Sequence, residues 1–318
     1  MNIVVTGSIA YDYLMRFPGH FKDHLIPEEL HQVSVSFLVE EMTKHWGGVA
    51  ANIAYTLGVM GLQPKLMGTA GRDFPDYRNW LENVGVDTST VRQLDHVFTA
   101  SFFVNTDLDN NQIASFYAGA MSLAKDYSLQ DALNGKPDLI VISPNDPGAM
   151  SNYAEESRKM GVRFIYDPSQ QVARLSGEEL KQDMQGAYAM FANAYEAKII
   201  CQKTGLTIDD LRKMVDVLVI TQGPNGCHVY ENGTLAEIPA FPTNIIKDPT
   251  GVGDAFRAGF IFGLSHEWDI ELCAKVGSLC ATYVLEQVGT QGHRYTTDEF
   301  IQRFRAEYDD GGKLNSML

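Results

Sequence analysis

The sequence predicts an α/β protein whose central, mainly parallel sheet is flanked by helices and carries a small β-sheet lid. The first observation is that short apolar runs alternate with helical patterns along most of the 318 residues, which is typical of βαβ units. The second is that these runs are continuously apolar, which indicates strands covered on both faces. The third is that segments 33–39 and 97–117 have the pattern of antiparallel strands outside this alternation.

The elements of the central layer follow one another along the chain. Apolar runs that end in a small or polar residue predict strands at 2–7, 138–143, 163–168, 187–193 and 216–223. The intervening patterns predict helices at 49–60, 147–160, 194–203, 254–264 and 269–287. Strands and helices in this order build a mostly parallel sheet. The residues after Asp309 have the composition of a frayed polar tail.

The lid is predicted from the two segments that break the alternation. Segment 97–117 contains the polar stretch 107–111, DLDNN, which predicts the turn of a hairpin. Segment 33–39 alternates as VSVSFLV and predicts a further strand. We therefore expect an α/β core over residues 1–11, 46–96 and 121–318, and a lid over residues 12–45 and 97–120.

Charge and hydropathy disfavour two classes of partner. The chain carries 25 Lys and Arg against 40 Asp and Glu, a net charge of −15, and a field of this sign argues against nucleic-acid binding. The sequence lacks a run of about 18 apolar residues, so we expect no membrane-spanning helix. The first residues lack the basic region and cleavage site of a signal peptide, so a cytoplasmic protein is expected. A local nest of backbone N–H groups can still bind a small anion.

The stretch 248–260, DPTGVGDAFRAGF, places two glycines ahead of an acidic residue and a helix of small residues. Gly251 and Gly253 allow the backbone to approach an anion closely. The helix N-terminus adds unpaired N–H groups and the positive end of its dipole. Asp254 in the first turn is then a base for an attacking hydroxyl. The alternative is that Asp254 only complements the helix dipole.

The stretch 221–226, TQGPNG, follows a predicted strand and offers a second place for a phosphate. Gly223 and Gly226 form a tight turn in which the backbone can meet a phosphate or a ribose. The alternative is an ordinary hairpin turn. Together, the motifs at 193–197, 221–226 and 248–260 suggest a nucleoside triphosphate site. The chain has no GxxxxGK[ST] sequence, so this site would be built without that loop.

The stretch 193–197, NAYEA, lies where a predicted strand ends and a helix begins. Asn193 and Glu196 are three residues apart and can project toward one site. Such a pair suits a magnesium ion that is held largely by water and phosphates. The alternative is that Asn193 caps the helix and Glu196 completes a capping box.

Polar residues in the N-terminal half predict a site for the acceptor. Asp12 follows the first strand closely, and the stretch 45–54, HWGGVAANIA, places Gly48 at a helix start and Asn52 in its first turns. An aspartate, an asparagine and glycine amides suit the vicinal hydroxyls of a sugar. The alternatives are a turn cap for Asp12, close helix packing for the glycines and a solvent-facing Asn52.

Aromatic and amide side chains predict that the acceptor contains a flat base. Phe102 and Phe116 fall on neighbouring strands of the predicted hairpin, where their rings can sandwich such a base. They can equally form the core of the small sheet. In DPSQQVARL, Gln170 and Gln171 are able to read a base edge, and Arg174 can contact a phosphate or pair with an acid. The alternative is a plain polar loop.

In this order the glycine pair with Asn52, the NxxE, the TxGxxG and the DxTGxGD resemble the PfkB (ribokinase-like) carbohydrate kinase family over nearly the full chain. Val252 stands where the family pattern commonly has alanine. Within the family, TGSIAYDYLMRFPGHF, QIASFYAGAMS and DPSQQVARLSGEE look like adenosine kinases of bacterial type. The resemblance implies a ribokinase-like fold and ATP-dependent phosphorylation of the adenosine 5′-hydroxyl in purine salvage, with magnesium. The alternative acceptor is another nucleoside or a sugar such as ribose.

The resemblance also implies roles for individual residues. It implies Asp254 as the base and the backbone amides of Gly251, Val252, Gly253 and Asp254 as the anion hole. The residues implied to hold adenosine are Ser8, Asp12, Ser36, Gly48, Asn52, Phe102, Phe116, Gln170 and Gln171. Those implied to serve ATP and magnesium are Asn193, Glu196, Thr221, Gly223 and Gly226, with potassium near Asp248 and Thr250. The exposed face of the lid predicts a homodimer.

Overall fold

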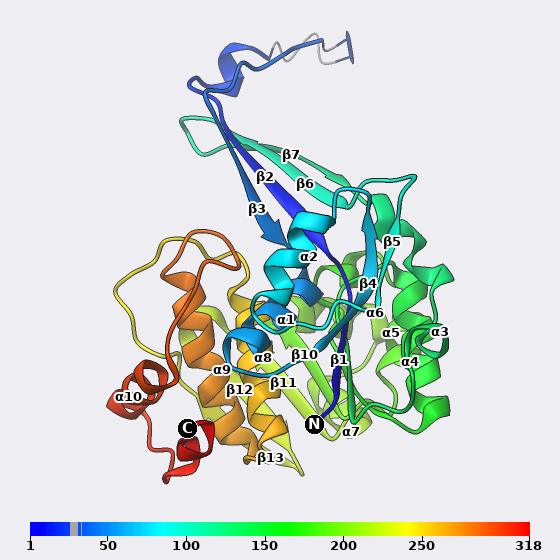
Figure 1. Cartoon of the computed structure of the whole chain (residues 1–318), viewed down its shortest axis with the longest axis vertical. Helices are drawn as coiled ribbons and strands as arrows, with labels where there is room; N and C mark the ends of the chain where they lie inside the picture. Colours follow the sequence, from blue (N-terminus) through cyan, green and yellow to red (C-terminus); the bar gives the residue numbers. More distant parts are fainter. Residues whose placement is uncertain (26–30, 33) are drawn as a thin grey trace.

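A computed structural model describes residues 1–25, 31–32 and 34–318 and shows a large α/β domain from which a small sheet projects (Figure 1). The large sheet has nine strands, which in spatial order are β13 (Thr234–Ile238), β12 (Cys227–Glu231), β11 (Val217–Thr221), β10 (Ala189–Asn193), β9 (Arg163–Tyr166), β8 (Leu139–Ile142), β1 (Ile3–Thr6), β4 (Lys65–Gly71) and β5 (Val91–Leu94). Neighbours from β11 to β5 are parallel, whereas β12 and β13 pair antiparallel. The mainly parallel sheet expected from the sequence is confirmed.

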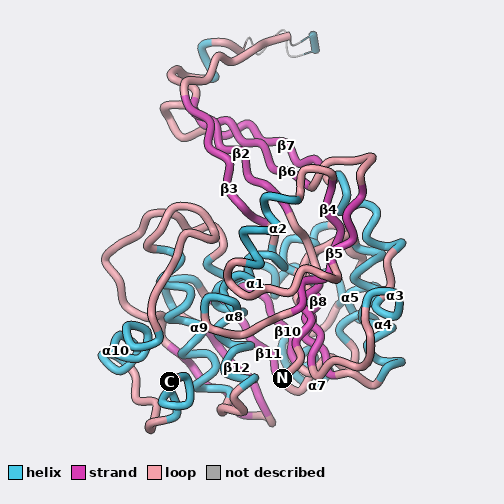
Figure 2. The backbone as a smooth tube through the Cα atoms, viewed as in Figure 1, coloured by secondary structure: helices cyan, strands magenta, loops and turns pink. Residues whose placement is uncertain are grey.

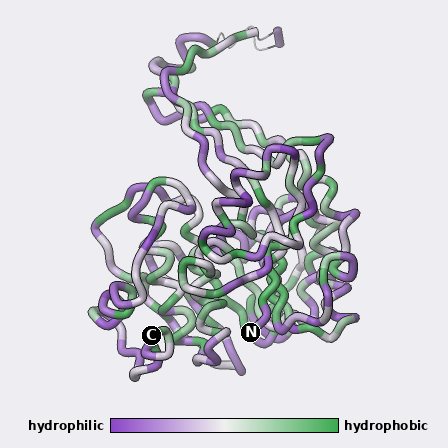
Figure 3. The backbone as a smooth tube through the Cα atoms, in the orientation of Figure 1, coloured by the Kyte–Doolittle hydropathy of each residue, from purple (hydrophilic) through white to green (hydrophobic). Residues whose placement is uncertain are grey.

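The strands that the sequence predicts are β1, β8, β9, β10 and β11. Their apolar side chains are buried on both faces of the sheet, which explains why each forms a continuous apolar run. Figure 3 shows the hydrophobic colouring along the strands in the middle of the large domain. β4 lacks such a run because it contains Gly68 and Gly71, and a side chain at Gly71 would collide with the backbone of Phe98.

Helices cover both faces of the large sheet (Figure 2). One face packs against α1 (Val49–Val59), α2 (Pro75–Glu82), α8 (Val252–Ser265), α9 (Ile270–Leu285) and α10 (Thr297–Glu307). The other packs against α3 (Leu129–Ala132), α4 (Pro147–Met160), α5 (Gly177–Met184), α6 (Ala194–Thr204) and α7 (Ile208–Met214). The predicted helices correspond to α1, α4, α6, α8 and α9. Among the described residues, no helix has the combination of length and apolar character that a membrane span requires.

The lid is a four-stranded sheet that lies apart from the large one. Its strands, in spatial order, are β3 (Glu41–Gly47), β2 (Ala10–Arg16), β6 (Ala100–Thr106) and β7 (Gln112–Tyr117). β6 and β7 pair as a hairpin with Thr106 opposite Gln112, so the predicted turn at 107–111 is confirmed. The described parts of the segment between β2 and β3 lie at the end of the lid that is farthest from the large domain (Figure 1).

The strand predicted at 33–39 is wrong. Val33 lies outside the described residues, and residues 34–39 form no strand. The pairing of β3 with β2 begins at Glu41, opposite Arg16 at the end of β2, so residues 34–39 lie beyond the paired part. An alternating pattern needs both a partner and a face to bury, and Leu38 is 85% exposed.

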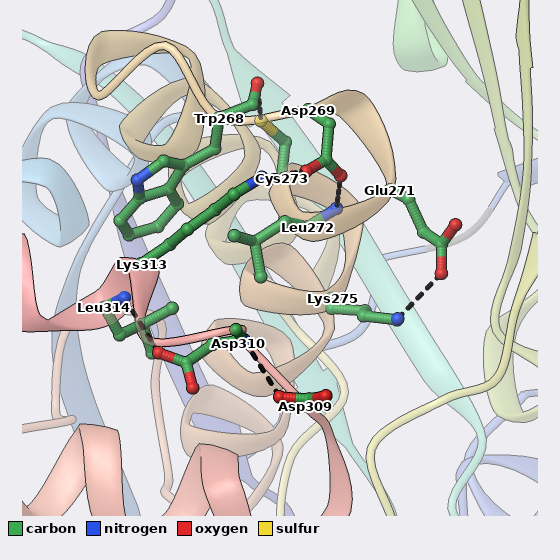
Figure 4. Close-up of polar contacts among 11 residues, drawn as sticks. Trp268, Asp269, Glu271, Leu272, Cys273, Lys275, Asp309, Asp310, Lys313 and Leu314 are labelled. Carbon is green, nitrogen blue, oxygen red and sulfur yellow. Dashed lines mark hydrogen bonds and ion pairs between the residues drawn. The ribbon is translucent and has the colours of Figure 1, made fainter.

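The polar tail predicted after Asp309 is also not frayed. It forms a 3-10 turn, η6 (Lys313–Met317), that packs near the start of α9 (Figure 4). The backbone N–H of Leu314 donates to Asp310 Oδ2 at 2.8 Å, and the Leu314 side chain is fully buried. Lys313 pairs with Asp269 at the start of α9. A buried leucine and paired charges therefore hold a segment whose composition alone predicts disorder.

Candidate active site

Several of the predicted polar residues lie where parallel strands of the large sheet end. Ser8 follows β1, and Asp167 follows β9. Asn193 is the last residue of β10 and stands in register with Thr221, the last residue of β11. Because the strands are parallel, these ends share one edge of the sheet. Ligands of open α/β sheets bind at this edge.

The start of α8 reaches the same edge and is shaped by Gly251. This residue caps the helix with φ of 77°, a left-handed conformation that favours glycine. A β-carbon at Gly251 would also come within 2.8 Å of the Thr290 β-carbon. The N–H of Val252 donates to the Pro249 carbonyl at a long 3.4 Å. Among the described residues, the N–H groups of Gly253 and Asp254 find no acceptor, so this turn can receive an anion.

Asp254 stands in the first turn of α8 and is partly buried. Its Oδ2 accepts a hydrogen bond of 2.8 Å from Nδ2 of Asn52. Burial raises the pKa of Asp254 to about 7, while Arg257 and the bond from Asn52 act in the opposite direction. The carboxylates of Asp167 and Asp12 add to the increase. A carboxyl group with this pKa can accept a proton near neutral pH.

A chain of hydrogen bonds fixes the orientation of Asn52. Gln291 Nε2 donates to Asn52 Oδ1 at 2.9 Å. Thr290 Oγ1 lies 2.8 Å from both Asn52 Oδ1 and the Trp46 carbonyl, which share its one proton. Trp80 Nε1 donates to Gln291 Oε1 at 3.0 Å. Since an indole N–H can only donate, it fixes the amide of Gln291, which fixes the amide of Asn52 with Nδ2 toward Asp254. The alternative of a solvent-facing Asn52 is wrong, because that residue is buried.

Sequence reasoning missed Trp80, Thr290 and Gln291. They lie in α2 and in the segment that follows α9, far from Asn52 along the chain. The one signal was polar Thr290 and Gln291 between two glycines at 289–292, GTQG. Only the folded chain shows that these side chains converge on Asn52.

A buried ion pair lies beside Asp254 and was also missed. Arg257 donates from Nη2 to Asp167 Oδ1 at 2.8 Å and to Ser169 Oγ at 3.1 Å, and its Nε pairs with Asp167 Oδ2. The signal was an arginine within the otherwise apolar helix of DPTGVGDAFRAGF. Ser169 has φ of 39°, which is uncommon for a residue with a side chain. Such backbone conformations concentrate at functional sites.

Ser8 and Gly48 shape the start of α1 beside Asn52. Ser8 Oγ accepts the Val49 N–H at 2.9 Å, which leaves the hydroxyl proton of Ser8 available. Gly48 caps α1 with φ of 92°. A β-carbon at Gly48 would lie 2.6 Å from the Ala10 nitrogen, so this glycine allows close packing against the backbone of residues 8–10.

The lid presents a row of side chains from its four strands. Asp12 is in register with His45 on one side and with Phe102 on the other, and Phe102 is in register with Phe116. Residues in register point to the same face of a sheet. Phe116 is 53% exposed, and all of β7 is exposed, so Phe116 is not core of the small sheet. Burial, with a contribution from Asp248, raises the pKa of Asp12 to about 6.

The remaining residues that were predicted to contact the nucleoside differ in their burial. Gln171 is buried, and its Oε1 has no hydrogen-bond partner among the described residues. Gln170 and Arg174 are exposed. Ser36 is exposed and precedes Glu41, the end of β3 that lies away from Gly47, so this structure does not bring it to Asp254. Of this group, Gln171 alone leaves a buried polar atom that a ligand can satisfy.

Asn193 and Glu196 form the capping box that was the alternative for them. Asn193 Oδ1 accepts the N–H groups of Tyr195 and Glu196 at 2.9 and 2.8 Å. Glu196 Oε2 accepts the Asn193 N–H at 2.8 Å. Burial raises the pKa of Glu196 above its ordinary value. Its Oε1 accepts no hydrogen bond from the described residues, so one carboxylate oxygen is left for water on a metal ion.

The turn that contains Gly223 and Gly226 joins β11 to the antiparallel β12, so it is a hairpin turn. Both glycines have positive φ, of 59° and 86°. The turn follows Thr221 directly and therefore lies at the strand edge described above.

Asp248 and Thr250 form a compact turn before α8. Asp248 Oδ1 accepts the Thr250 N–H at 2.9 Å, and Oδ2 accepts the Gly289 N–H at 3.0 Å. Burial raises the pKa of Asp248, but these hydrogen bonds outweigh it and the pKa lies below its ordinary value. The carboxylate therefore stays charged, as a cation ligand must.

Comparison with known proteins agrees with this architecture. Residues 2–297 match the model of the pfkB family carbohydrate kinases. The nucleoside kinase of Methanothermobacter thermautotrophicus is 30% identical, and the match covers 96% of each chain. The structure of Burkholderia thailandensis nucleoside kinase in complex with inosine is 34% identical with a TM-score of 0.85, covering 96% of this chain and 98% of that one.

A second structure extends the likeness. The nucleoside kinase of Methanocaldococcus jannaschii, an archaeal member of the ribokinase family, is 27% identical with a TM-score of 0.86. The match covers 96% of this chain and 99% of that one. The ribokinase-like fold predicted from the sequence is thereby confirmed. These relatives are nucleoside kinases, so the comparisons do not show the narrower likeness to adenosine kinases.

Proposed function

We propose, because this chain belongs to the pfkB family of carbohydrate kinases, that it transfers the γ-phosphoryl group of ATP to the 5′-hydroxyl of a nucleoside. The observation that carries the proposal is the position of Asp254. It is held by Asn52 at the start of a helix whose first N–H groups have no acceptor among the described residues. The similarity to nucleoside kinases supports a nucleoside as acceptor.

Asp254 would act as the general base. Its carboxylate accepts the proton of the 5′-hydroxyl while the oxygen forms a bond to the γ-phosphorus. The bond from that phosphorus to the oxygen bridging to the β-phosphate breaks, and ADP leaves. The free N–H groups of Gly253 and Asp254 stabilise the charge on the phosphoryl oxygens. Approach of the lid to the large domain would exclude water from the site.

The face of the lid that carries Asp12 would bind the nucleoside. The carboxylate of Asp12 can accept hydrogen bonds from the ribose hydroxyls. Phe102 and Phe116 follow in the same row and offer aromatic faces to a base. The buried Oε1 of Gln171 supplies an acceptor for a donor on the base edge. Adenosine is one such nucleoside, and the relative from Burkholderia thailandensis binds inosine.

Metal ions complete the proposal at two places. Magnesium would neutralise charge on the ATP phosphates, and Glu196 Oε1 is the oxygen that can reach it through water. Asp248 and Thr250 would hold potassium, for which the ionised Asp248 carboxylate is suited. Asn193 is a weaker candidate as a ligand, because its Oδ1 already accepts two N–H groups.

The assembly and location predicted from the sequence are part of the same proposal. The lid exposes apolar side chains, among them Met42, Phe103, Ile113 and Tyr117. A second copy that covers this surface would make a homodimer through the lids, and the protein would work in the cytoplasm. A monomeric mass by sedimentation at micromolar concentration would contradict the dimer.

The first test is ADP release from MgATP, coupled to a spectrophotometric assay, with adenosine, inosine, guanosine, cytidine and free ribose compared. Turnover of one or more nucleosides, with ribose inert, supports the proposal and shows which nucleobases the site accepts. Turnover of adenosine alone supports the narrower assignment. Turnover of ribose with all nucleosides inert would overturn the nucleoside assignment and leave a sugar kinase.

A further inference from the structure

Arg257 carries a positive charge in the interior of the site. It lies one helical turn after Asp254 on α8 and is only 6% exposed. Its Nε and Nη2 are engaged by Asp167 and Ser169. Nη1 has no hydrogen-bond partner among the described residues. A guanidinium carries five N–H donors, so the Nη1 donors remain free while the rest of the group is held in a fixed plane.

The free nitrogen lies beside the turn that is expected to hold the anion. A β-carbon at Gly253 would come within 2.8 Å of Nη1. Nη1 therefore occupies the space that a side chain at Gly253 would need. Long helical side chains lean toward the N-terminus of their helix, which brings Nη1 from Arg257 to the first turn. The N–H groups of Gly253 and Asp254, which have no acceptor among the described residues, lie in that same turn.

The ion pair with Asp167 leaves one nitrogen of Arg257 unused. Asp167 alone already balances the charge of Arg257, and it does so with its two oxygens on Nε and Nη2. Nη1 has no partner among the described residues and is not one of the fully buried side-chain atoms, so its donors are open to a ligand in the site. An anion at the start of α8 would satisfy them.

We propose that Arg257 Nη1 donates a hydrogen bond to a non-bridging oxygen of the phosphoryl group while that group passes from ATP to the acceptor. The inference rests on the proposed function and deepens it by naming a further catalytic residue. Asp167 is then a positioning residue that holds the guanidinium plane. No bond other than those of the transfer itself forms or breaks.

The charges around Arg257 fit this role. Burial lowers the pKa of Arg257, but the carboxylates of Asp167, Asp254 and Glu196 outweigh this effect, so the guanidinium stays charged. The proposed base and the proposed magnesium-binding residue are therefore both near this cation. Arginine suits this contact because its planar fork can bind one anion on one side and another on the opposite side.

The test compares Arg257→Lys with the wild-type chain. A lysine can still pair with Asp167, but its single ammonium lacks the second nitrogen that faces Gly253. We expect kcat to fall by about 10²–10³-fold, as for loss of one donor to a developing charge, with the dissociation constants of ATP and nucleoside unchanged. Arg305→Lys is the matched control, because Arg305 makes the same two-pronged pair with Asp310 away from the site.

A second readout does not depend on turnover. ADP with aluminium fluoride and magnesium mimics the phosphoryl group in flight, and its binding together with the accepted nucleoside is measured by calorimetry. We expect Arg257→Lys to weaken this complex by about the same factor as kcat. Equal kcat and equal affinity for aluminium fluoride in Arg257→Lys and wild type would overturn the inference and leave Arg257 a structural residue.

If Arg257→Lys does not fold, the double variant Arg257→Met with Asp167→Asn removes both buried charges together, which is better tolerated than removing one. The same loss of kcat is expected there. Wild-type turnover of a sugar, but of no nucleoside, would overturn the substrate assignment, and the same comparison on that sugar would still decide the role of Arg257. A wild-type chain that turns over no acceptor and binds no ADP–aluminium fluoride would overturn both.

Discussion

Asn52 Nδ2 lies 2.8 Å from Asp254 Oδ2, and this hydrogen bond joins α1 to α8 across 202 residues of sequence. The side-chain oxygen of Asn52 accepts hydrogen bonds from Gln291 and Thr290, which hold its amide in this orientation. The acceptor stands where the helix start is open to an anion. The proposed base therefore has its position set by residues from three distant parts of the chain.

Asp254→Asn should retain nucleoside binding and lose turnover. The asparagine has nearly the same shape but cannot take the proton of the hydroxyl, so kcat should fall by about 10²–10⁴-fold, the usual contribution of a general base. Steady-state kinetics and calorimetric titration with the nucleoside measure the two effects separately. Asp269→Asn, at the start of α9, is the control. Near-normal turnover of Asp254→Asn would remove the role assigned to this residue.

The same variant should be more stable than the wild type at alkaline pH. Because the folded-state pKa of Asp254, about 7, lies above the unfolded value of 3.8, the folded protein binds the extra proton, and stability falls as pH rises between these values. The charges that face Asp254 are Arg257, Asp167 and Asp12. Asparagine removes the cost of the buried charge.

We therefore expect the melting temperature of Asp254→Asn to exceed that of the wild type at pH 8, with a smaller difference at pH 5. Thermal melts across this range, monitored by circular dichroism, give the comparison. A constant difference at all pH values would show that Asp254 does not titrate as its environment indicates.

Trp80→Phe should lower kcat although Trp80 is not proposed to touch either substrate. Phenylalanine keeps an aromatic ring next to Tyr55 but removes the N–H that fixes the amide of Gln291. Loss of one neutral hydrogen bond between Trp80 and Gln291 costs about 0.5–1.5 kcal/mol, which corresponds to about a 2- to 10-fold decrease in kcat. The pH at which activity is half-maximal should also shift, because Asn52 would hold Asp254 less firmly.

Trp268→Phe is the control for this experiment, since Trp268 lies in the turn between α8 and α9. A decrease of the same size in both variants would mean that loss of an indole affects activity only through general stability. An unchanged pH profile in Trp80→Phe would likewise contradict a role in orienting the base.

Phe102→Ala should weaken nucleoside binding, and Phe103→Ala should not. Phe102 shares the face of the lid with Asp12, whereas Phe103 points to the opposite face and stacks on Tyr13 at 4.8 Å between ring centroids. Loss of one stacked ring costs about 1–3 kcal/mol of binding free energy. Calorimetric titration of both variants with the accepted nucleoside measures the difference. Equal affinities of the two variants for the nucleoside would contradict stacking and indicate that Phe102 serves only the structure of the small sheet.

The sequence predicted those parts of the fold in which a residue pattern can arise from only one structure. Strands buried on both faces, such as β8 and β11, form continuous apolar runs because every side chain meets a helix layer. β3 shows no such run, because its side chains face solvent and the site on a projecting sheet. The segment 33–39 has the alternation of a strand, yet β2 ends at Arg16 opposite Glu41, so residues 34–39 lie beyond the paired part of the small sheet.

The candidate site also has a part that the sequence predicted and a part that it did not. Asp254 and the glycines before it are adjacent in sequence, so a local motif determines their turn, their free N–H groups and the start of α8. The alternatives left open for Asn52 and the omission of Gln291 and Arg257 have a common cause. Their orientation depends on partners that are distant in sequence.

By itself the sequence determined the strands β1, β8, β9, β10 and β11, the helices between them, the turn at the start of α8 and the polar residues at the strand ends, because these depend on residues close together in the chain. The tertiary structure alone decided that Trp80 and Gln291 orient Asn52 and that Asp167 fixes the plane of Arg257. It also decided that Asp12 lies in one row with Phe102. These relationships arise when strands and helices that are far apart in sequence pack side by side, and burial then gives each charge and each amide the partners that set its pKa and its direction.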